Sequence, residues 1–223
     1  TLRAAAFGHY TVRQLHLGGG SPSFLSPEQH QRLMALLKDA FNFADDAQCS
    51  IEIDPRTVDT DYISALANAG YRRISIGVQD TDYNVQQAIN RVQSTSHIAI
   101  LVEHARQVGF ESVNLDLIYG LPHQTEETFK TTLAAVKAME PERVSLFSYA
   151  HLPERFAAQR KIKNEWLPSA ELKLALMKQA MATLSEVGYE LIGMDHFAKD
   201  DDELAVAQRQ GELHRNFQGY TTS

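Results

Sequence analysis

Two observations predict an α/β protein with a parallel central sheet. Short strand-like runs alternate along the chain with helical segments of about 10 to 20 residues, as expected for right-handed crossovers between parallel strands. Many of these runs also end in glycine or polar residues, and parallel sheets bind their ligands at the carboxyl ends of the strands. The order of elements fits both an open doubly wound sheet and a barrel, and the spacing favours the barrel.

Five strand-like runs carry this pattern up to residue 151. The first, LHL, is followed directly by Gly18, Gly19 and Gly20, where bare backbone N–H and C=O groups can approach a ligand closely. The other four runs end in or beside polar side chains, and they are residues 51–55, 73–80, 113–120 and 143–151. Together these strand ends could form one site.

Capping residues and apolar periodicity predict the helices between the strands. Ser26 is expected to cap a helix that has Pro27 at its first position, and residues 60–70 are expected to form a helix closed by Gly70. Further helices are expected near residues 83–90, from about Ser96 to Gly109, from Thr125 to just before Pro141, and from Ser169 to Gly188.

The pattern changes after His151. Residues 152–168 mix charges, aromatics and prolines, which predicts an inserted loop with short helical parts. Residues 189–198 are expected to form one more strand and residues 201–210 a short exposed helix. Residues 214–222 fit no single type of element.

Composition excludes several classes of protein. The chain has 223 residues, 43% of them hydrophobic, and a net charge of −7, which suits a folded globular protein and argues against nucleic-acid binding. No apolar run approaches the roughly 20 residues of a membrane-spanning helix, and no signal peptide is recognisable. A cytoplasmic protein without a membrane span is therefore expected.

The sequence lacks the common metal-binding and catalytic motifs. Cys49 is the single cysteine, so the chain cannot supply the several thiolates that an iron–sulfur cluster normally requires. The histidines show no compact ligand spacing, and no metal site is predicted. The chain also lacks a G-x-S-x-G elbow, a Walker loop and a G-x-G-x-x-G motif.

Several polar residues, most of them at or near strand ends, are candidate ligand contacts. Glu52 and Asp54 would share one face of a regular strand and could bind hydroxyls or a metal, although acidic residues at such a position also cap the next turn. Gln79, Asp116, Tyr119 and Tyr149 carry groups that can orient a polar ligand. Arg91 could pair with a ligand carboxylate or lie on the solvated surface.

The sequence resembles the oxygen-independent coproporphyrinogen III oxidases of the radical S-adenosylmethionine superfamily over essentially its whole length. The segments that carry the resemblance are LHLGGGSPSFL, IEIDPR, RISIGVQD, VNLDLIYGLP, FSYAHLPERFAAQRKIK, IGMDHFAKDDDELAVAQRQG and HRNFQGYTT. The glycine run and the βα rhythm are shared across the superfamily, whereas AHLPERFAAQRKIK and HRNFQGYTT are specific to these oxidases.

This resemblance implies a parallel-stranded partial (βα) barrel of the radical S-adenosylmethionine type and an enzyme of haem biosynthesis. Such enzymes decarboxylate two propionates of coproporphyrinogen III oxidatively, without oxygen, to give protoporphyrinogen IX. They use a [4Fe-4S] cluster, two S-adenosylmethionine molecules and electrons from a donor protein. The cluster cleaves one S-adenosylmethionine to a 5'-deoxyadenosyl radical, which takes a propionate hydrogen.

The resemblance also implies the site residues. Gly19 and Glu52 match contacts to the cluster-bound S-adenosylmethionine. The positions that match contacts to the second S-adenosylmethionine are Gly20, Ser21, Gln79, Arg91, Asp116 and Ala150. Phe217 and Gln218 resemble a segment near the active site.

The chain departs from the family in one respect, because the C-x-x-x-C-x-x-C segment that binds the cluster is absent. Residues 1–223 are therefore expected to be an internal fragment of a single partial-barrel domain, without the cluster-binding part and the C-terminal domain. The full-length parent would be the oxidoreductase, and the fragment alone would be inactive.

Two other functions remain open. A haem chaperone of the same superfamily would bind haem for delivery, but such relatives end this region with a different pattern from the Tyr220–Thr221 found here. An ordinary α/β barrel enzyme could use the glycine run to bind a phosphorylated substrate, but no glycine-rich turn follows the late strands.

Overall fold

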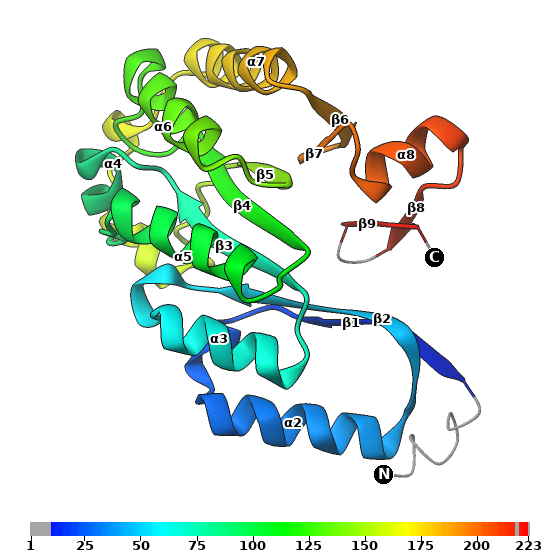
Figure 1. The fold of residues 1–223 in the computed structure, drawn as a ribbon. Coiled ribbons are helices and arrows are strands. Elements are labelled where there is room, and N and C mark those ends of the chain that lie inside the picture. Colours follow the sequence, from blue (N-terminus) through cyan, green and yellow to red (C-terminus); the bar gives the residue numbers. More distant parts are fainter. Residues whose placement is uncertain (1–9, 217–218, 223) are drawn as a thin grey trace. The chain divides into compact units, whose positions relative to one another are not determined.

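The computed structural model describes residues 10–216 and 219–222. Seven strands form one sheet, in the order β1-β2-β3-β4-β5-β7-β6 (Figure 1). The strands are β1 (Thr11–Leu17), β2 (Asn42–Ile53), β3 (Arg73–Gln79), β4 (Ser112–Tyr119), β5 (Arg143–Ser148), β6 (Tyr189–Gly193) and β7 (His196–Lys199), and a separate antiparallel pair consists of β8 (His214–Asn216) and β9 (Gly219–Thr221).

The helices alternate with the strands, as the sequence predicts. They are α2 (Pro27–Ala40), α3 (Thr60–Ala69), α4 (Tyr83–Ala88), α5 (Thr95–Gln107), α6 (Glu126–Met139), α7 (Ala170–Glu186) and α8 (Glu203–Gln210). Short 3-10 turns follow several strand ends, and they are η1 (Pro22–Phe24), η2 (Pro55–Thr57), η3 (Ala157–Lys161) and η4 (Asn164–Trp166). The inserted loop predicted for residues 152–168 therefore has the expected short helical parts.

The chain divides into two compact units. The N-terminal unit comprises residues 1–77 and 99–114, and the C-terminal unit comprises residues 78–98 and 115–223. The last residues of β3 and the second half of β4 belong to the C-terminal unit. Each unit has its own buried residues and its own set of strand ends.

The N-terminal unit shows why the local sequence signals were informative. Ser26 caps α2 in a capping box, in which its side chain accepts from the Gln29 N–H and the Gln29 side chain accepts from the Ser26 N–H. Gly70 ends α3 in the left-handed conformation at φ +107°. The strand predicted for residues 51–55 begins much earlier, at Asn42, because its first half pairs with β1 and needs no continuous apolar run.

The pairing of β1 with β2 positions the glycine run. The two strands are parallel, with Leu17 opposite Ile51, and β2 pairs in parallel with β3. Gly18, Gly19 and Gly20 thus leave β1 beside the last residues of β2. Ile51 is fully buried and Ile53 nearly so, which fixes the strand's apolar face and directs Glu52 to the opposite face.

The prediction of one strand over residues 189–198 was wrong. These residues form an antiparallel hairpin of β6 and β7, and β7 pairs antiparallel with β5. The chain reverses at Gly193 and Met194, whose φ angles are +154° and +45°. The apolar residues on both sides of this turn concealed it, because glycine followed by methionine is not a common turn signal.

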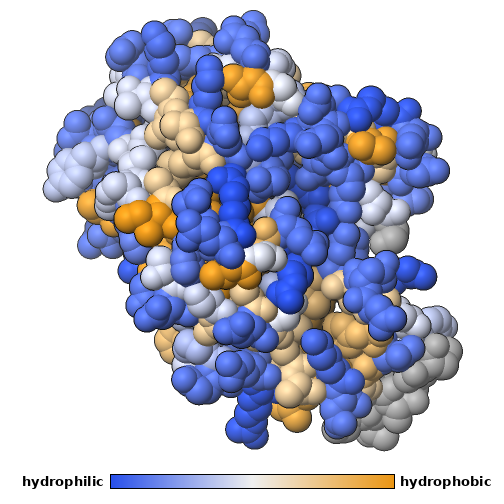
Figure 2. Space-filling model, viewed as in Figure 1, coloured by the Kyte–Doolittle hydropathy of each residue, from blue (hydrophilic) through white to orange (hydrophobic). Residues whose placement is uncertain are grey.

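Within the C-terminal unit, α6 and α7 lie side by side (Figure 1). Residues 214–222, for which the sequence fitted no single element, contain the β8–β9 pair. Phe217 and Gln218 lie outside the described residues, so their expected place near the site is not described. Hydrophilic residues cover most of the face shown in Figure 2. Among the described residues, no helix is both long enough and apolar enough to cross a bilayer.

Candidate functional site

Glu52 is the centre of a polar cluster at the end of β2. The Gly19 N–H donates to Glu52 Oε2 at 3.2 Å, and His16 Nε2 lies 3.1 Å from Glu52 Oε1. The other ring nitrogen of His16 is 2.8 Å from the Ser50 hydroxyl. The structure therefore brings together Gly19 and Glu52, the pair expected to contact one S-adenosylmethionine.

The three glycines of the run that follows β1 have two roles. A Cβ at Gly18 would lie 2.6 Å from Glu52 Oε1 and closer still to His16 Nε2, so a larger residue there would force these two side chains to shift. Gly19 and Gly20 adopt φ angles of +75° and +61°, and a Cβ at either position would meet no atom within 4 Å. Their backbone is thus open to a ligand, and their conformation disfavours any larger residue.

The charge of Glu52 is favoured by its neighbours. The hydrogen bond with His16 lowers the pKa of the Glu52 carboxyl, and the Gly19 N–H acts in the same direction against the effect of burial. The Glu52 side chain remains 43% exposed. An ionised, accessible carboxylate that is held in place by a backbone N–H suits the recognition of ligand hydroxyl or amino groups.

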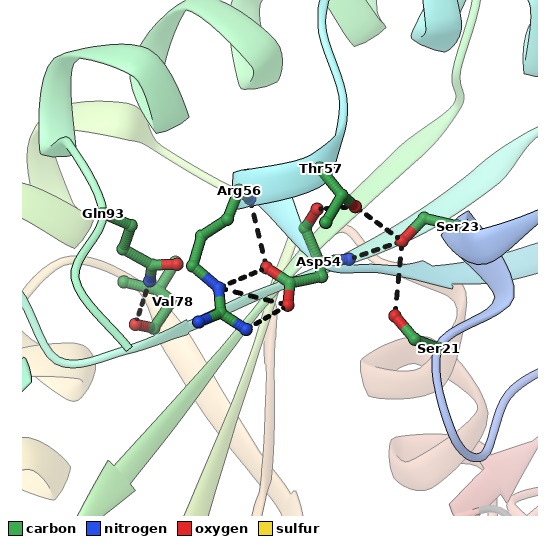
Figure 3. A network of polar contacts seen from close by, with 7 residues as sticks. All are labelled: Ser21, Ser23, Asp54, Arg56, Thr57, Val78 and Gln93. Carbon is green, nitrogen blue, oxygen red and sulfur yellow. Dashed lines mark hydrogen bonds and ion pairs between the residues drawn. The ribbon is translucent and has the colours of Figure 1, made fainter. Parts of the chain in front are cut away.

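Asp54 has a different role from Glu52. Its carboxylate forms an ion pair with Arg56 at 2.6 Å and accepts the Arg56 backbone N–H at 3.1 Å, as Figure 3 shows. The buried Ser23 hydroxyl accepts the Asp54 backbone N–H at 3.2 Å and lies 3.4 Å from the Ser21 hydroxyl. The structure therefore favours the capping interpretation for Asp54 and leaves Glu52 as the ligand candidate.

The C-terminal unit contains four of the expected contacts. Gln79 ends β3 with a φ of +66°, and the Asp80 N–H donates to the Val78 carbonyl at 2.8 Å across it. Gln79 is thus the central residue of a tight three-residue turn, a backbone conformation that is strained for any residue other than glycine. Arg91 follows α4, and its N–H donates to the Gln86 carbonyl at 2.8 Å.

The other expected contacts of this unit lie on β4 and after β5. Asp116 is half-buried on β4, and Ala150 is exposed two residues beyond β5. The Ala150 carbonyl accepts from the Gln159 side chain at 3.0 Å. The Tyr149 N–H donates to the Tyr119 carbonyl at 2.9 Å, and the Tyr149 hydroxyl lies 3.2 Å from His151 Nδ1.

Sequence reasoning missed the residues that support these contacts. His16 and Ser50 orient Glu52, and a buried set of polar side chains around Asp80 surrounds the Gln79 turn. The available signal for His16 was its position two residues before the glycines. For Asp80 the signal was a carboxylate at the end of an apolar strand, where a buried charge requires partners.

The described residues do not fit an iron–sulfur cluster. No group of three or more His, Cys, Asp or Glu side chains among them could hold a metal ion. Cys49 is only 3% exposed, and burial raises the pKa of its thiol. A buried, protonated thiol is a poor cluster ligand, and one cysteine is too few in any case.

The sheet is mostly parallel, and α/β proteins with such a sheet bind their ligands at the carboxyl ends of the strands. Residues 2–136, more than half of the chain, match the radical SAM superfamily. The chain belongs to this superfamily, whose cofactors are S-adenosylmethionine and a [4Fe-4S] cluster.

Two curated relatives match this chain over the same length and with the same sequence identity. The chain is 54% identical over 220 residues to the oxygen-independent coproporphyrinogen III oxidases of Salmonella typhimurium and Escherichia coli. The match covers 99% of this chain and 48% of each relative. The chain thus spans about half the length of the curated relatives it matches.

Solved structures agree on the fold. The coproporphyrinogen III oxidase of Escherichia coli, a radical SAM enzyme, matches with a TM-score of 0.97 at 53% identity, over 100% of this chain and 51% of that one. The Elp3 protein of Methanocaldococcus infernus matches with a TM-score of 0.59 at 15% identity, over 80% of this chain and 47% of that one, which shows the fold alone. The fold class is therefore the parallel-stranded partial (βα) barrel of the radical SAM type.

Proposed function

We propose that the chain is part of an oxygen-independent coproporphyrinogen III oxidase. The full-length enzyme would convert two propionate side chains of coproporphyrinogen III to vinyl groups and release protoporphyrinogen IX. The observation that carries this proposal is the 54% identity over 99% of the chain to relatives of that name. The proposal includes a cytoplasmic location and a protein electron donor, which cell fractionation and reduction assays with candidate donors would test.

In this proposal the N-terminal unit binds the S-adenosylmethionine that contacts the cluster. The Glu52 carboxylate accepts hydrogen bonds from the ligand, and the backbone of Gly19 lies against it. Support comes from the hydrogen bond between these two residues and from the open space above Gly19. S-adenosylmethionine held by these residues would supply the one-electron chemistry for oxidation of the propionates and loss of carbon dioxide.

A second S-adenosylmethionine is part of the proposal. Its contacts would be Gly20, Ser21, Gln79, Arg91, Asp116 and Ala150, as the resemblance implies. The guanidinium of Arg91 suits a carboxylate, and the Asp116 carboxylate suits hydroxyl or amino groups. Support comes from the polar or bare-backbone character of all these positions except Ala150, and from the place of Gly20, Ser21, Gln79 and Ala150 at or just beyond strand ends. Asp116 lies within β4, and Arg91 follows α4.

The cluster ligands are proposed to lie outside this chain, because Cys49 is buried and stands alone. Residues 1–223 would then be a fragment of a single partial-barrel domain. On this proposal the isolated chain binds no [4Fe-4S] cluster. Iron–sulfur reconstitution that gave the isolated chain a stoichiometric cluster, read by absorbance and iron content, would contradict it.

The decisive experiment uses the full-length protein after anaerobic reconstitution. With S-adenosylmethionine and a reductant, we expect coproporphyrinogen III to be consumed and protoporphyrinogen IX to form, as measured by chromatography of the oxidised porphyrins. The variant Glu52→Gln should lose most of this activity. Glu186→Gln, which changes an exposed carboxylate at the end of α7, serves as the matched control and should keep it. Stable haem binding without turnover would instead favour a haem chaperone.

A further inference from the structure

A cluster of buried polar side chains adjoins the Gln79 turn and includes Asp80, the last residue of that turn. Its members, here called the Asp80 cluster, are Asp80, Gln86, Gln124 and Thr132, and each is at most 2% exposed. All four belong to the C-terminal unit. None of them was among the residues expected to contact a cofactor.

Both oxygens of the Asp80 carboxylate accept hydrogen bonds. Its Oδ1 accepts from the Thr132 hydroxyl at 3.0 Å and from the Asp82 N–H at 2.7 Å. Its Oδ2 accepts from Gln124 Nε2 at 2.6 Å. A buried carboxylate without such partners would be strongly destabilising. Because the donors reach both carboxylate oxygens, they also fix its orientation.

Gln124 extends the cluster to the end of β4. Its Nε2 also donates to the Ile118 carbonyl at 2.8 Å, and its Oε1 accepts the Leu121 N–H at 2.9 Å. Thr132 on α6 extends it in another direction, because its hydroxyl accepts the Thr81 N–H at 3.1 Å. The cluster therefore joins the end of β3, the end of β4 and α6 through side-chain hydrogen bonds.

Gln86 connects the cluster to the segment that carries Arg91. Its Nε2 donates to the Asp80 carbonyl at 2.9 Å, and its Oε1 accepts the Gln93 N–H at 3.1 Å. The Gln93 side chain in turn donates to the Val78 carbonyl, a contact drawn in Figure 3. The Gln86 carbonyl also accepts the Arg91 N–H. Arg91 therefore lies between two residues that bond to the neighbours of Gln79, because Gln86 bonds to Asp80 and Gln93 bonds to Val78.

These contacts account for the conformation of Gln79. A positive φ at a glutamine is strained and persists only where its neighbours hold it. Here Val78 is held by Gln93, and Asp80 is held by Gln86, Gln124 and Thr132. Stability alone does not account for such a cluster, because apolar side chains of similar volume often stabilise a core as well as buried charged groups do. The fixed geometry of the turn is what this cluster adds.

We propose that the Asp80 cluster is a positioning device, which holds Gln79 and Arg91 in the arrangement that binds the second S-adenosylmethionine. This inference rests on the proposed function, which assigns those two residues to that ligand. The cluster itself makes no contact with the ligand. Its contribution is to hold the strained turn at Gln79 and the Arg91 segment in one conformation before the ligand arrives.

The test compares two substitutions of the buried Thr132 in the full-length reconstituted enzyme. Thr132→Val keeps the volume but removes the hydroxyl that donates to Asp80, whereas Thr132→Ser keeps the hydroxyl. S-adenosylmethionine binding is measured by calorimetric titration, which separates a first from a second binding event. We expect Thr132→Val to weaken the second event about tenfold and leave the first unchanged, and Thr132→Ser to restore the second event to within about twofold.

A control on the same helix separates positioning from simple loss of stability. Val136 is fully buried on α6 and has no polar group, so Val136→Ala destabilises the fold without changing the cluster. It should bind both S-adenosylmethionine molecules with wild-type affinity in its folded fraction. If Val136→Ala weakens the second event as much as Thr132→Val does, the positioning role is overturned.

The variants Gln79→Ala and Arg91→Ala distinguish failure of the inference from failure of the proposed function. If both weaken the second event while Thr132→Val does not, the inference is wrong and the proposed site stands. If neither changes the second event, the assignment of these residues to a second S-adenosylmethionine is wrong, and the inference fails with it.

Discussion

The end of β1 and the end of β3 both place the backbone in the left-handed region, but they do so with different residues. In the N-terminal unit Gly19 and Gly20 adopt this conformation without strain. In the C-terminal unit Gln79 adopts it, and hydrogen bonds to its neighbours hold it there. One strand end depends on the absence of a side chain, and the other depends on the side chains around it.

The acidic residues beside these turns differ in the same way. Glu52 is 43% exposed and is held by His16 and by one backbone N–H. Asp80 is fully buried and is held by two side chains and one backbone N–H. The comparison indicates that Glu52 is available to a ligand, whereas Asp80 acts on the backbone next to it.

The largest expected effect separates the fully buried Asp80 from the partly buried Asp54. Asp80→Ala should lower the free energy of unfolding by about 3 kcal/mol, because it leaves the buried donors of Gln124 and Thr132 without their acceptor. Asp54→Ala should cost only about 1 kcal/mol, because it removes a cap and a contact to Arg56, whose side chain is 36% exposed. Urea unfolding of both variants measures the difference, and equal losses would show that the Asp80 cluster contributes no more than the cap at Asp54.

A pair of reciprocal substitutions compares the two turns themselves. Gly19→Ala should destabilise the protein by about 1 kcal/mol through backbone strain alone, since its Cβ would meet no atom within 4 Å. Gln79→Gly should stabilise it by about 0.5 kcal/mol, because relief of strain exceeds the added entropy of the unfolded chain.

Thermal unfolding measures both changes, with Gly109→Ala as a further left-handed position at φ +94° and no atom within 4 Å of the added Cβ. It should cost about as much as Gly19→Ala. If Gln79→Gly destabilises the protein instead, then the glutamine side chain stabilises its own turn, and the contrast with Gly19 is smaller than the φ angles suggest.

Features of these regions that depend on interactions between residues close in the sequence could be predicted from the sequence. Caps such as Ser26 and Gly70 act within a few residues, and the alternation of strands and helices follows from local periodicity, so both could be predicted. The glycine run likewise indicated a site, because glycine has few other reasons to occur three times in succession. Glu52 followed from its position at a strand end and from resemblance.

The Asp80 cluster could not be predicted in this way. Asp80 bonds to side chains that lie 44 and 52 residues further along the chain, and nothing in the local sequence selects Gln124 or Thr132 over other polar residues. The hairpin of β6 and β7 was missed for a related reason, because its turn at Met194 depends on pairing between β7 and β5. Both features come from tertiary contacts, which local patterns do not report.

The pH dependence of stability should have one sign at Asp80. Burial raises the pKa of the Asp80 carboxyl above its ordinary value of 3.8, and it outweighs the hydrogen bonds from Gln124, the Asp82 N–H and Thr132, which act in the opposite direction. The folded state then binds the proton more tightly than the unfolded state, so this group's contribution to stability falls as pH rises from about 3.8 through the folded pKa. The unfolding free energy of the wild type minus that of Asp80→Asn should therefore fall as pH rises across this range. A difference that stays constant would contradict the prediction.

Glu52 should show a smaller dependence of the opposite sign. The bonds from His16 and the Gly19 N–H lower the pKa of its carboxyl below the ordinary value of 4.5, so its contribution is complete above 4.5 and is lost as pH falls through the folded pKa. The effect is small because the exposed carboxylate is screened by water and salt. The difference between wild type and Glu52→Gln should therefore shrink on acidification, and more clearly at low than at high ionic strength. A difference that grows on acidification would mean that Glu52 resembles Asp80, and the contrast between an accessible carboxylate and a buried one would no longer hold.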